Sequence, residues 1–327
     1  MKILFTSVGR RVELLQAFRH AAEKNGVDLT IIGVDISRDA PALYFCDITE
    51  IVCRISDKNY IPSLLAICER ENVDCLIPTI DTDLLLLSKH KHCFEHIGTK
   101  VLISRTEKVQ ICRDKNYTAD YFISLGLKSP KPFDSVEKYE AELNLKKQSF
   151  PAFIKPKDGS SSINAYRVDK LDDLKLYAEK IRDYIIQPYI SGKEYTIDIF
   201  CDYDGNPVYI TPRERMAVRA GEVLKTRIVQ DEVMIAEMQA LIADYMPCGQ
   251  ITVQLIRDEK TGDNYYIEIN PRFGGGAPLS MKAGADSAEA VLKMLNGDRL
   301  SYHNKAARDG AIYCRFDQSI CVNEDGK

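Results

Sequence analysis

The chain has 327 residues, of which 45% are hydrophobic and 28% charged, and its formal net charge at pH 7 is −4. This length predicts two or three domains, and the composition is that of a globular protein rather than a disordered one. No clustered basic face is indicated, so we expect no nucleic-acid partner. No apolar run approaches the roughly 20 residues that cross a bilayer, so we expect no membrane segment.

The ten cysteines are expected to be reduced thiols. They are scattered without a Cys-x-x-Cys pair, and several, such as Cys75, lie in apolar runs where a free cysteine behaves as a small hydrophobe. The opening residues reach Arg10 and Arg11 before a secretory hydrophobic region develops. We therefore expect a cytoplasmic protein, because disulfides are rare in that compartment.

Short apolar runs alternate with helical spacing over the first hundred residues. Strands are expected at 2–7, 28–35, 74–78 and 101–104, and helices at 12–24, 61–70 and 82–92. Continuously apolar strands between helices are typical of a parallel sheet covered on both faces. Residues 1–105 therefore predict a Rossmann-like α/β domain.

From residue 106 the pattern changes to α+β. Two short helices are expected over 106–125, followed by a linker at Ser129–Pro132. The later strands are expected at 151–156, 160–168, 184–188, 195–201, 207–212, 250–257 and 264–269, with helices at 171–181 and 232–245. Turn residues such as Asp204-Gly205-Asn206 predict that successive strands pair as antiparallel hairpins.

The last of these strands carries a polar set of side chains. Glu268 and Asn270 point to one face, because side chains alternate along a strand, and Arg272 follows just beyond Pro271. Gln254, on the neighbouring strand of the hairpin, can face the same point. A carboxylate and amide oxygens suit Mg²⁺ with a polyphosphate, and a guanidinium neutralises phosphoryl charge. The alternative interpretation is a solvated surface strand.

Two other segments could contact a nucleotide. Lys155 ends an apolar strand, and the backbone N–H groups of the small-residue loop after it could cover phosphates. That loop contains Ser160, Ser161 and Ser162. Further on, the backbone around Gln187, Pro188 and Tyr189 could read an adenine edge, and Glu194 could accept from ribose hydroxyls. In isolation, each segment could equally be an ordinary connection with a charged side chain in solvent.

The order and spacing of these segments resemble the ATP-grasp superfamily, in particular its carbamoyl-phosphate-synthetase-like branch. In the resemblance, Lys115 is a phosphate-binding residue on a helix, and Lys155 precedes the phosphate loop. Glu194 follows Gln187 by seven residues, and Gln254 precedes Glu268 by fourteen, as in that branch. The resemblance covers about residues 108–285, and residues 76–83 look like part of the family's N-terminal domain.

The resemblance implies a Rossmann-like pre-ATP-grasp domain (1–105), a small ATP-grasp lobe (106–187) and a large lobe (188–327), with ATP between the lobes. It implies an ATP- and Mg²⁺-dependent (or Mn²⁺-dependent) ligase that phosphorylates a carboxylate and joins it to an amine or a thiol. Arg272 and Lys155 are the implied catalytic cations, and Gln254, Glu268 and Asn270 the implied metal ligands. Gln187 departs from the family, which usually has glutamate there.

The charge-rich segment 212–225 corresponds to a region that faces the γ-phosphate and the acceptor in related ligases. We assign Arg219 and Lys225 to it as candidate catalytic residues, the alternative being an exposed basic loop. Gly9-Arg10-Arg11 lacks the G-x-G-x-x-G of dinucleotide sites, but arginines at a helix N-terminus can hold an anionic substrate. The histidines at 90, 92 and 96, with Cys93, are interpreted as structural or solvated rather than metal ligands.

Two alternatives from other classes stay open. One is a non-catalytic nucleotide-binding protein on the ATP-grasp fold, and the other is a dinucleotide-dependent oxidoreductase using the N-terminal domain. The identities of the carboxylate and of the amine do not follow from the sequence, because such contacts come from loops. The oligomeric state is also open, with a homodimer as the commonest soluble assembly.

Overall fold

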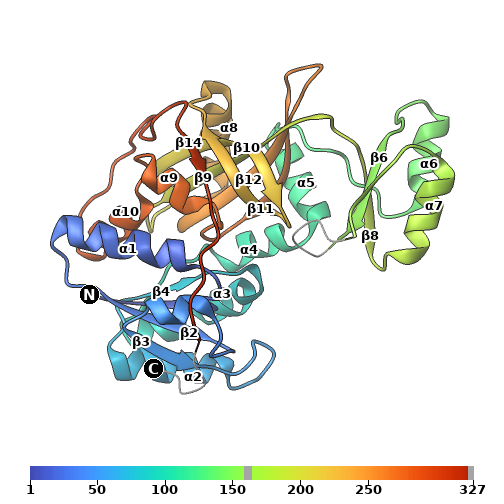
Figure 1. The fold of residues 1–327 in the computed structure, drawn as a ribbon. Helices are drawn as coiled ribbons and strands as arrows, with labels where there is room; N and C mark the ends of the chain where they lie inside the picture. Colours follow the sequence, from blue (N-terminus) through green and yellow to red (C-terminus); the bar gives the residue numbers. More distant parts are fainter. Residues whose placement is uncertain (158–163, 323–327) are drawn as a thin grey trace.

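The computed structural model describes residues 1–157 and 164–322, which form three parts around a central six-stranded sheet (Figure 1). A parallel five-stranded sheet with its helices lies below this central sheet in the view of Figure 1. A small three-stranded sheet with two helices lies to its right. Within the described ranges, no helix has the length and hydropathy needed to cross a membrane.

The N-terminal part is a parallel sheet of strand order β3-β2-β1-β4-β5. Its elements are β1 (Lys2–Thr6), α1 (Val12–Asn25), β2 (Thr30–Asp35), η1 (Pro41–Phe45), β3 (Ile48–Ile51), α2 (Tyr60–Glu71), β4 (Cys75–Pro78), α3 (Asp81–His96) and β5 (Lys100–Val101). Ile3 and Phe5 pack with α1 on one face, whereas Leu4 packs with α2 and α3 on the other. Successive side chains of a strand point to opposite faces, and helices cover both faces of this sheet, which explains why its strands are continuously apolar in the sequence.

Three elements of this domain differ from expectation. The edge strand β3 and the 3₁₀ turn η1 were not predicted, because Thr49 and Glu50 interrupt the apolar pattern of a half-exposed strand. The strand expected at 101–104 is reduced to two paired residues, since β5 pairs with β4 only at Lys100 and Val101. The strand order reverses between β1 and β4, and the crevice beyond this point is where open α/β sheets bind ligands.

The small sheet has the order β7-β6-β8 and is antiparallel. Its elements are α6 (Val136–Asn144), β6 (Ala152–Pro156), β7 (Tyr166–Val168), α7 (Leu171–Lys180) and β8 (Tyr184–Pro188). Residues of both helices, such as Tyr139 and Leu174, share its core with Ile154. Helix α6 was not predicted, and part of the strand expected at 160–168 lies outside the described residues.

Helices α4 (Thr106–Arg113) and α5 (Lys115–Ser124) connect the N-terminal part to the rest. The sequence placed them with the small lobe. In the structure, Phe122 is fully buried in the core of the large sheet and lies against the Tyr266 ring, with centroids 5.3 Å apart. The small lobe proper is therefore attached through the linker that follows α5.

The central sheet has the order β13-β12-β9-β10-β11-β14, with antiparallel neighbours. Its elements are β9 (Gly192–Cys201), β10 (Pro207–Arg219), β11 (Glu222–Ile228), α8 (Glu232–Tyr245), β12 (Gly249–Asp258), β13 (Asn264–Asn270), α9 (Ala277–Lys282), α10 (Ser287–Leu295) and β14 (Ile312–Cys314). Helix α8 has the predicted bounds and packs its apolar side on one face. Strands β11 and β14 and helices α9 and α10 were not predicted.

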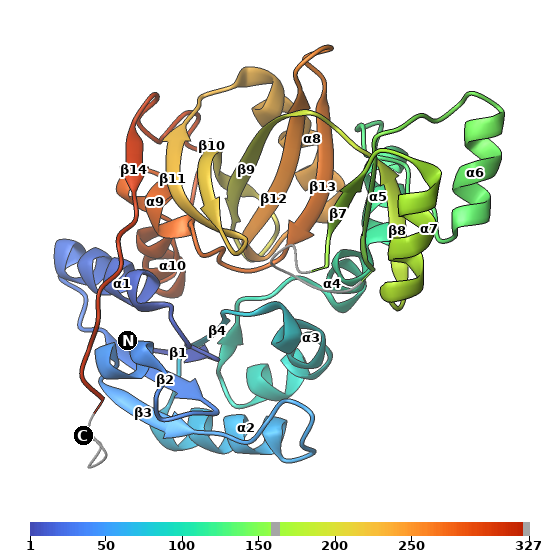
Figure 2. The same cartoon turned by 45° about the vertical axis from the view of Figure 1, so that its right-hand side comes forward.

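The N-terminal part and the large sheet share one core. Met281 of α9 and Val291 of α10 are buried in the same cluster as Phe5 and Phe18. Phe18 of α1 also meets Phe273 edge-on, with ring centroids 5.8 Å apart. Figure 2 shows the C-terminal segment running from β14 past α1 to the N-terminal part. These contacts fix the N-terminal part against the large sheet.

A buried ion pair holds the centre of the large sheet. Arg213 of β10 donates through Nε to Asp198 Oδ2 of β9 at 2.7 Å, and the two side chains are 2% and 3% exposed. Thr252 of β12 and Ser280 of α9 donate to the same carboxylate, at 3.1 and 2.7 Å. One carboxylate therefore ties three strands and a helix together, while Arg213 Nη1 stays buried without a partner.

Candidate active site

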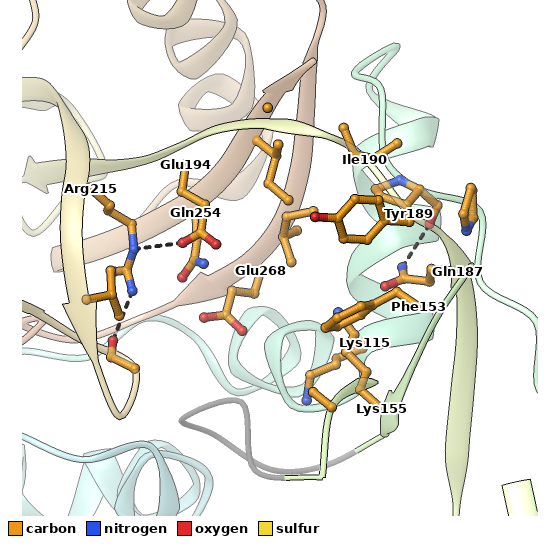
Figure 3. A pocket seen from close by; sticks show the side chains of 18 of the residues that line it. Lys115, Phe153, Lys155, Gln187, Tyr189, Ile190, Glu194, Arg215, Gln254 and Glu268 are labelled. Carbon is orange, nitrogen blue, oxygen red and sulfur yellow. Dashed lines mark hydrogen bonds and ion pairs between the residues drawn. The ribbon is translucent and has the colours of Figure 1, made fainter. Parts of the chain in front are cut away.

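A cavity of about 310 Å³ lies between the small sheet and the large sheet. Figure 3 shows its two walls: Lys115, Phe153, Lys155, Gln187 and Tyr189 line one side, opposite side chains from the large sheet. The facing side chains are Glu194, Arg215, Gln254 and Glu268. Most of the residues selected from the sequence thus meet in one cavity, although more than 150 positions separate Lys115 from Glu268.

One end of the cavity is aromatic and apolar. Phe153 of β6 and Tyr189, just after β8, lie with ring centroids 6.3 Å apart, beside Pro188. Gln187 is almost fully buried, and its Nε2 donates to the carbonyl oxygen of Pro130 at 2.8 Å. This explains why glutamine stands where glutamate is usual, because an ionised carboxylate would face that carbonyl with no proton to donate. The amide oxygen of Gln187 remains available as an acceptor for an amino group.

The polar end of the cavity is built on β12 and β13. Gln254 and Glu268 are direct partners in the strand register, which shifts between Gln254 and Leu255. Asn270 Nδ2 donates to Glu268 Oε1 at 3.1 Å, and Arg272 Nη2 donates to Asn270 Oδ1 at 3.3 Å. The expected common face of Glu268, Asn270 and Arg272 is therefore present, although Asn270 and Arg272 lie beyond the cavity lining.

These residues fit a hydrated Mg²⁺ ion that also takes phosphate oxygens. They offer one carboxylate and two amide groups, too few ligands for a cage made of protein alone, as is usual for Mg²⁺. Consistently, no group of three or more His, Cys, Asp or Glu suited to a metal occurs in the described part of the chain. Asn270 would have to turn its amide oxygen toward Glu268 to join such an ion, because its Nδ2 now points there.

Two lysines reach the cavity from the small-lobe side. Lys115, at the start of α5, donates through Nζ to the carbonyl oxygen of Lys157 at 3.0 Å. The pKa of Lys155 is lowered to about 8, mainly by burial; the Glu268 charge opposes this shift, and the nearby Lys115 charge adds a smaller lowering. Ser160, Ser161 and Ser162, assigned to the phosphate loop, lie outside the described residues.

The depressed pKa of Lys155 predicts a conflict between binding and stability. In the unfolded chain, Lys155 has a pKa of about 10.4. Below pH 8 the lysine is charged in both states, so folding must bury the charge, and this lowers the free energy of unfolding. Between about pH 8 and 10.4 the unfolded state binds more protons than the folded state, so the destabilisation caused by the buried charge disappears as pH rises. We expect Lys155→Met to raise the unfolding free energy at pH 7 by about 1–3 kcal/mol, discounted for partial exposure, with the gain vanishing above pH 10.

If Lys155 contacts the nucleotide phosphates, as the resemblance implies, the same variant should lose ten- to a hundredfold in MgADP affinity, because a charge-assisted hydrogen bond contributes roughly 1.5–3 kcal/mol. Urea unfolding between pH 7 and 10.5 and titration calorimetry measure the two effects. Lys180→Met, on the exposed end of α7, is the matched control and should change neither. Equal stability of Lys155→Met and the wild type at pH 7 would contradict the prediction.

Arg215 of β10 is a cavity residue that sequence reasoning missed. Its Nε donates to Glu194 Oε2 at 3.2 Å, and its Nη2 donates to the carbonyl oxygen of Gly221 at 2.9 Å, as seen on the left of Figure 3. A register shift between Arg215 and Ala217 interrupts the alternation of β10, and such bulges redirect side chains beside functional sites. Recognising that β10 extends past Pro212 would have placed Arg215 beside Glu194.

The two cations selected from this segment lie elsewhere. Arg219 forms an ion pair with Asp317 at 2.9 Å and is 59% exposed. Lys225 lies in β11, where its backbone pairs with Cys314 of the edge strand β14. Neither lines the cavity. Arg272, by contrast, makes a second bridge, because its Nη2 lies 2.7 Å from Asp81 Oδ2 at the start of α3.

Two protein-family models match parts of this chain. Residues 3–102 match the model described as a PylC-like N-terminal domain, and residues 180–314 match the one described as ATP-grasp in the biosynthetic pathway with Ter operon. Among curated proteins, a carbamoyl-phosphate synthase of Methanobrevibacter smithii is 28% identical over 65% of this chain and 55% of its own length. A D-alanine–D-alanine ligase of Francisella tularensis is 27% identical over 55% of this chain and 64% of its own.

The N-terminal section of a carbamoyl phosphate synthase large chain from Aquifex aeolicus is 25% identical over 74% of this chain and 48% of its own length. The chain thus spans about half the length of these two carbamoyl phosphate synthases.

Solved structures share the fold over nearly the whole chain. The biotin carboxylase domain of Hydrogenobacter thermophilus 2-oxoglutarate carboxylase, a dimer solved with MgADP, has a TM-score of 0.74 and 18% identity. This comparison covers 96% of this chain and 74% of the other. An N5-carboxyaminoimidazole synthetase from Staphylococcus aureus has a TM-score of 0.71 and 16% identity, covering 92% and 78%. Together with the family models, they confirm the fold class expected from the sequence.

Proposed function

We propose that this chain, which belongs to the ATP-grasp superfamily, is an ATP- and Mg²⁺-dependent ligase. It would phosphorylate a carboxylate and join it to an amine. The observation that carries the proposal is the register pairing of Gln254 with Glu268 at the polar end of a cavity whose other end is aromatic and apolar. That arrangement has room for a nucleoside at one end and a metal-bound polyphosphate at the other.

The chain's own residues supply binding and charge. The adenine would lie against the Phe153 and Tyr189 rings, with its amino group toward the amide oxygen of Gln187. Glu194 is placed for the ribose hydroxyls, although Arg215 now holds its carboxylate at 3.2 Å. Lys115 and Lys155 would neutralise phosphate oxygens from the small-lobe side. A bound Mg²⁺, held by Glu268 with Gln254 and Asn270, would neutralise charge on the phosphate oxygens.

The reaction needs no nucleophile from the protein. A substrate carboxylate oxygen attacks the γ-phosphorus, ADP leaves, and a neutral amine then attacks the acyl carbon and expels phosphate, with its proton released to solvent. Catalysis is therefore mostly positioning and charge neutralisation. Arg272, anchored by Asp81 and Asn270 near the polar end, would stabilise the developing phosphoryl charge. A thiol in place of the amine would use the same first step.

Thermal unfolding with nucleotides tests the site directly. A ligand at about a hundred times its dissociation constant adds roughly 2.7 kcal/mol, which is a shift of a few degrees for a chain of this size. We expect such a shift with ADP, larger with added Mg²⁺, and none with NAD. A shift with NAD alone would contradict the proposal and move the function to the N-terminal part.

Turnover separates the ligase from a non-catalytic nucleotide-binding protein. We expect Mg²⁺-dependent release of ADP from ATP that increases when a matching carboxylate and amine are added. A protein that binds MgADP but releases no ADP with any carboxylate–amine pair would instead support the non-catalytic alternative.

A further inference from the structure

A carboxylate of the protein lies between two arginines where the N-terminal part meets the large sheet. Glu222 begins β11, Arg11 lies between β1 and α1, and Arg315 follows β14. Glu222 Oε1 is 3.9 Å from Arg11 Nη1, and its Oε2 is 3.2 Å from Arg315 Nη1. The three residues come from segments far apart in the sequence, so only the tertiary fold creates this arrangement.

The surroundings are shaped around this carboxylate. A side-chain Cβ at Gly275 would lie 2.1 Å from Glu222 Oε2 and 2.8 Å from Arg11 Nη1, so a glycine is needed to leave the space. Partial burial by itself raises the pKa of Glu222, but Arg11, Arg315 and Arg272 together lower it below the usual range. The position thus favours a negatively charged carboxylate.

Arg11 has more hydrogen-bonding capacity than its contacts use. Its guanidinium has five N–H donors, yet among residues 1–157 and 164–322 it makes one hydrogen bond, to the carbonyl oxygen of Thr79 at 3.2 Å, beside the long ion pair with Glu222. Burial is the main cause that lowers the Arg11 pKa, followed by repulsion from Arg272. A mostly buried guanidinium gains most from a closely bound, bidentate anion. Glu222 is half exposed at the end of a hairpin, so a bound anion can displace its carboxylate.

This arrangement adjoins the nucleotide cavity. Gly221, directly before Glu222, lines that cavity and accepts from Arg215. Thr79, which holds Arg11, follows β4, so the arginine lies at the point where the strand order reverses between β1 and β4. Ligands of open α/β sheets bind in the crevice at that point. Arg272 is near enough to Arg11 to lower its pKa and also donates to Asn270 at the polar end of the cavity.

We propose that Arg11 and Arg315 bind a second, non-reacting carboxylate of the substrate, and that Glu222 occupies this position in the ligand-free protein. This inference rests on the proposed ligase function and narrows its substrate to a dicarboxylate, including acidic amino acids. One carboxylate is anchored by Arg11 and Arg315, and the other is presented toward Arg272 and the γ-phosphate. Binding of the substrate moves Glu222, and with it the hairpin that contains Gly221.

Titration calorimetry in saturating MgADP tests this with four probes: glutarate, L-glutamate, butyrate and inorganic phosphate. Removing the competing charge with Glu222→Gln should tighten binding of a dicarboxylate at least about fivefold, since a partly exposed ion pair is worth about 1 kcal/mol. Butyrate, which has one carboxylate, should not gain. In the Glu222→Gln background, adding Arg11→Met or Arg315→Met should remove the gain.

Arg19→Met, in the same helix α1 but paired with Asp47, is the matched control and should leave dicarboxylate binding unchanged. The proposal is overturned if Glu222→Gln binds neither dicarboxylate, if butyrate or phosphate gains equally, or if Arg11→Met binds them as well. Failure of the ligase proposal is distinguishable, because it appears as loss of MgADP binding by the wild type. MgADP affinity should change less than about twofold in these variants, since none of them lines the nucleotide cavity.

Discussion

Replacing Glu268 with alanine is expected to reduce Mg²⁺-dependent ADP formation about a thousandfold or more, because several kcal/mol of transition-state stabilisation by the metal would be lost. Glu268 is the one carboxylate paired with Gln254 at the polar end of the cavity, so no neighbouring acid in this strand pair replaces it. The fold should persist, since the side chain is partly exposed and its hydrogen bond to Asn270 is local. Steady-state ADP release under saturating Mg²⁺ measures the effect.

Two further variants separate charge from structure. Glu268→Gln keeps the shape and the acceptor for Asn270 but removes the charge, so it should be nearly as inactive as the alanine variant. Glu259→Ala removes a carboxylate at the turn of the same hairpin, where it accepts from Ser191, and should retain activity. Wild-type turnover by Glu268→Gln would refute the assignment of this carboxylate to the metal.

The second large effect concerns stability rather than catalysis. Asp198→Ala should lower the free energy of unfolding by about 3–5 kcal/mol, because it leaves the Arg213 guanidinium buried without its counter-charge. Thr252 and Ser280 would also lose their common acceptor. Urea unfolding, followed by circular dichroism, measures the change.

The double variant Asp198→Leu with Arg213→Met distinguishes a lost interaction from an unpaired charge. Replacing both members of a buried pair with apolar residues is often neutral or stabilising. We therefore expect the double variant to recover most of the stability lost in Asp198→Ala. If it is as unstable as the single variant, the shape of this site, rather than the isolated charge, causes the loss.

Local patterns were sufficient where an element buries one regular face. Helix α8 has the predicted bounds, because its apolar residues follow a helical period and Asp231 caps its first turn by accepting from Met234. The pairing of β12 with β13, and hence of Gln254 with Glu268, followed from alternation and the turn between them. The edge strand β14 and the linking helices α9 and α10 were missed, because tertiary packing rather than a local period stabilises them.

In the candidate site, too, local patterns predicted some residues and missed others. Lys155, Gln187, Tyr189 and Glu194 could be selected from order and spacing, but the choice of Arg219 over Arg215 depended on where β10 ends and how its bulge turns each side chain. No local pattern indicates that Arg219 pairs with Asp317 far along the chain.

By itself, the sequence determined the helices and strands that have a regular local period, the parallel N-terminal sheet and the polar face of β13, because these depend on periodicity within a segment. The tertiary structure alone decided the Asp198–Arg213 pair, the bridge from Arg272 to Asp81, and the position of Glu222 between Arg11 and Arg315. Each joins residues from separate elements, and their distances are set by how the sheets and helices pack rather than by any local preference.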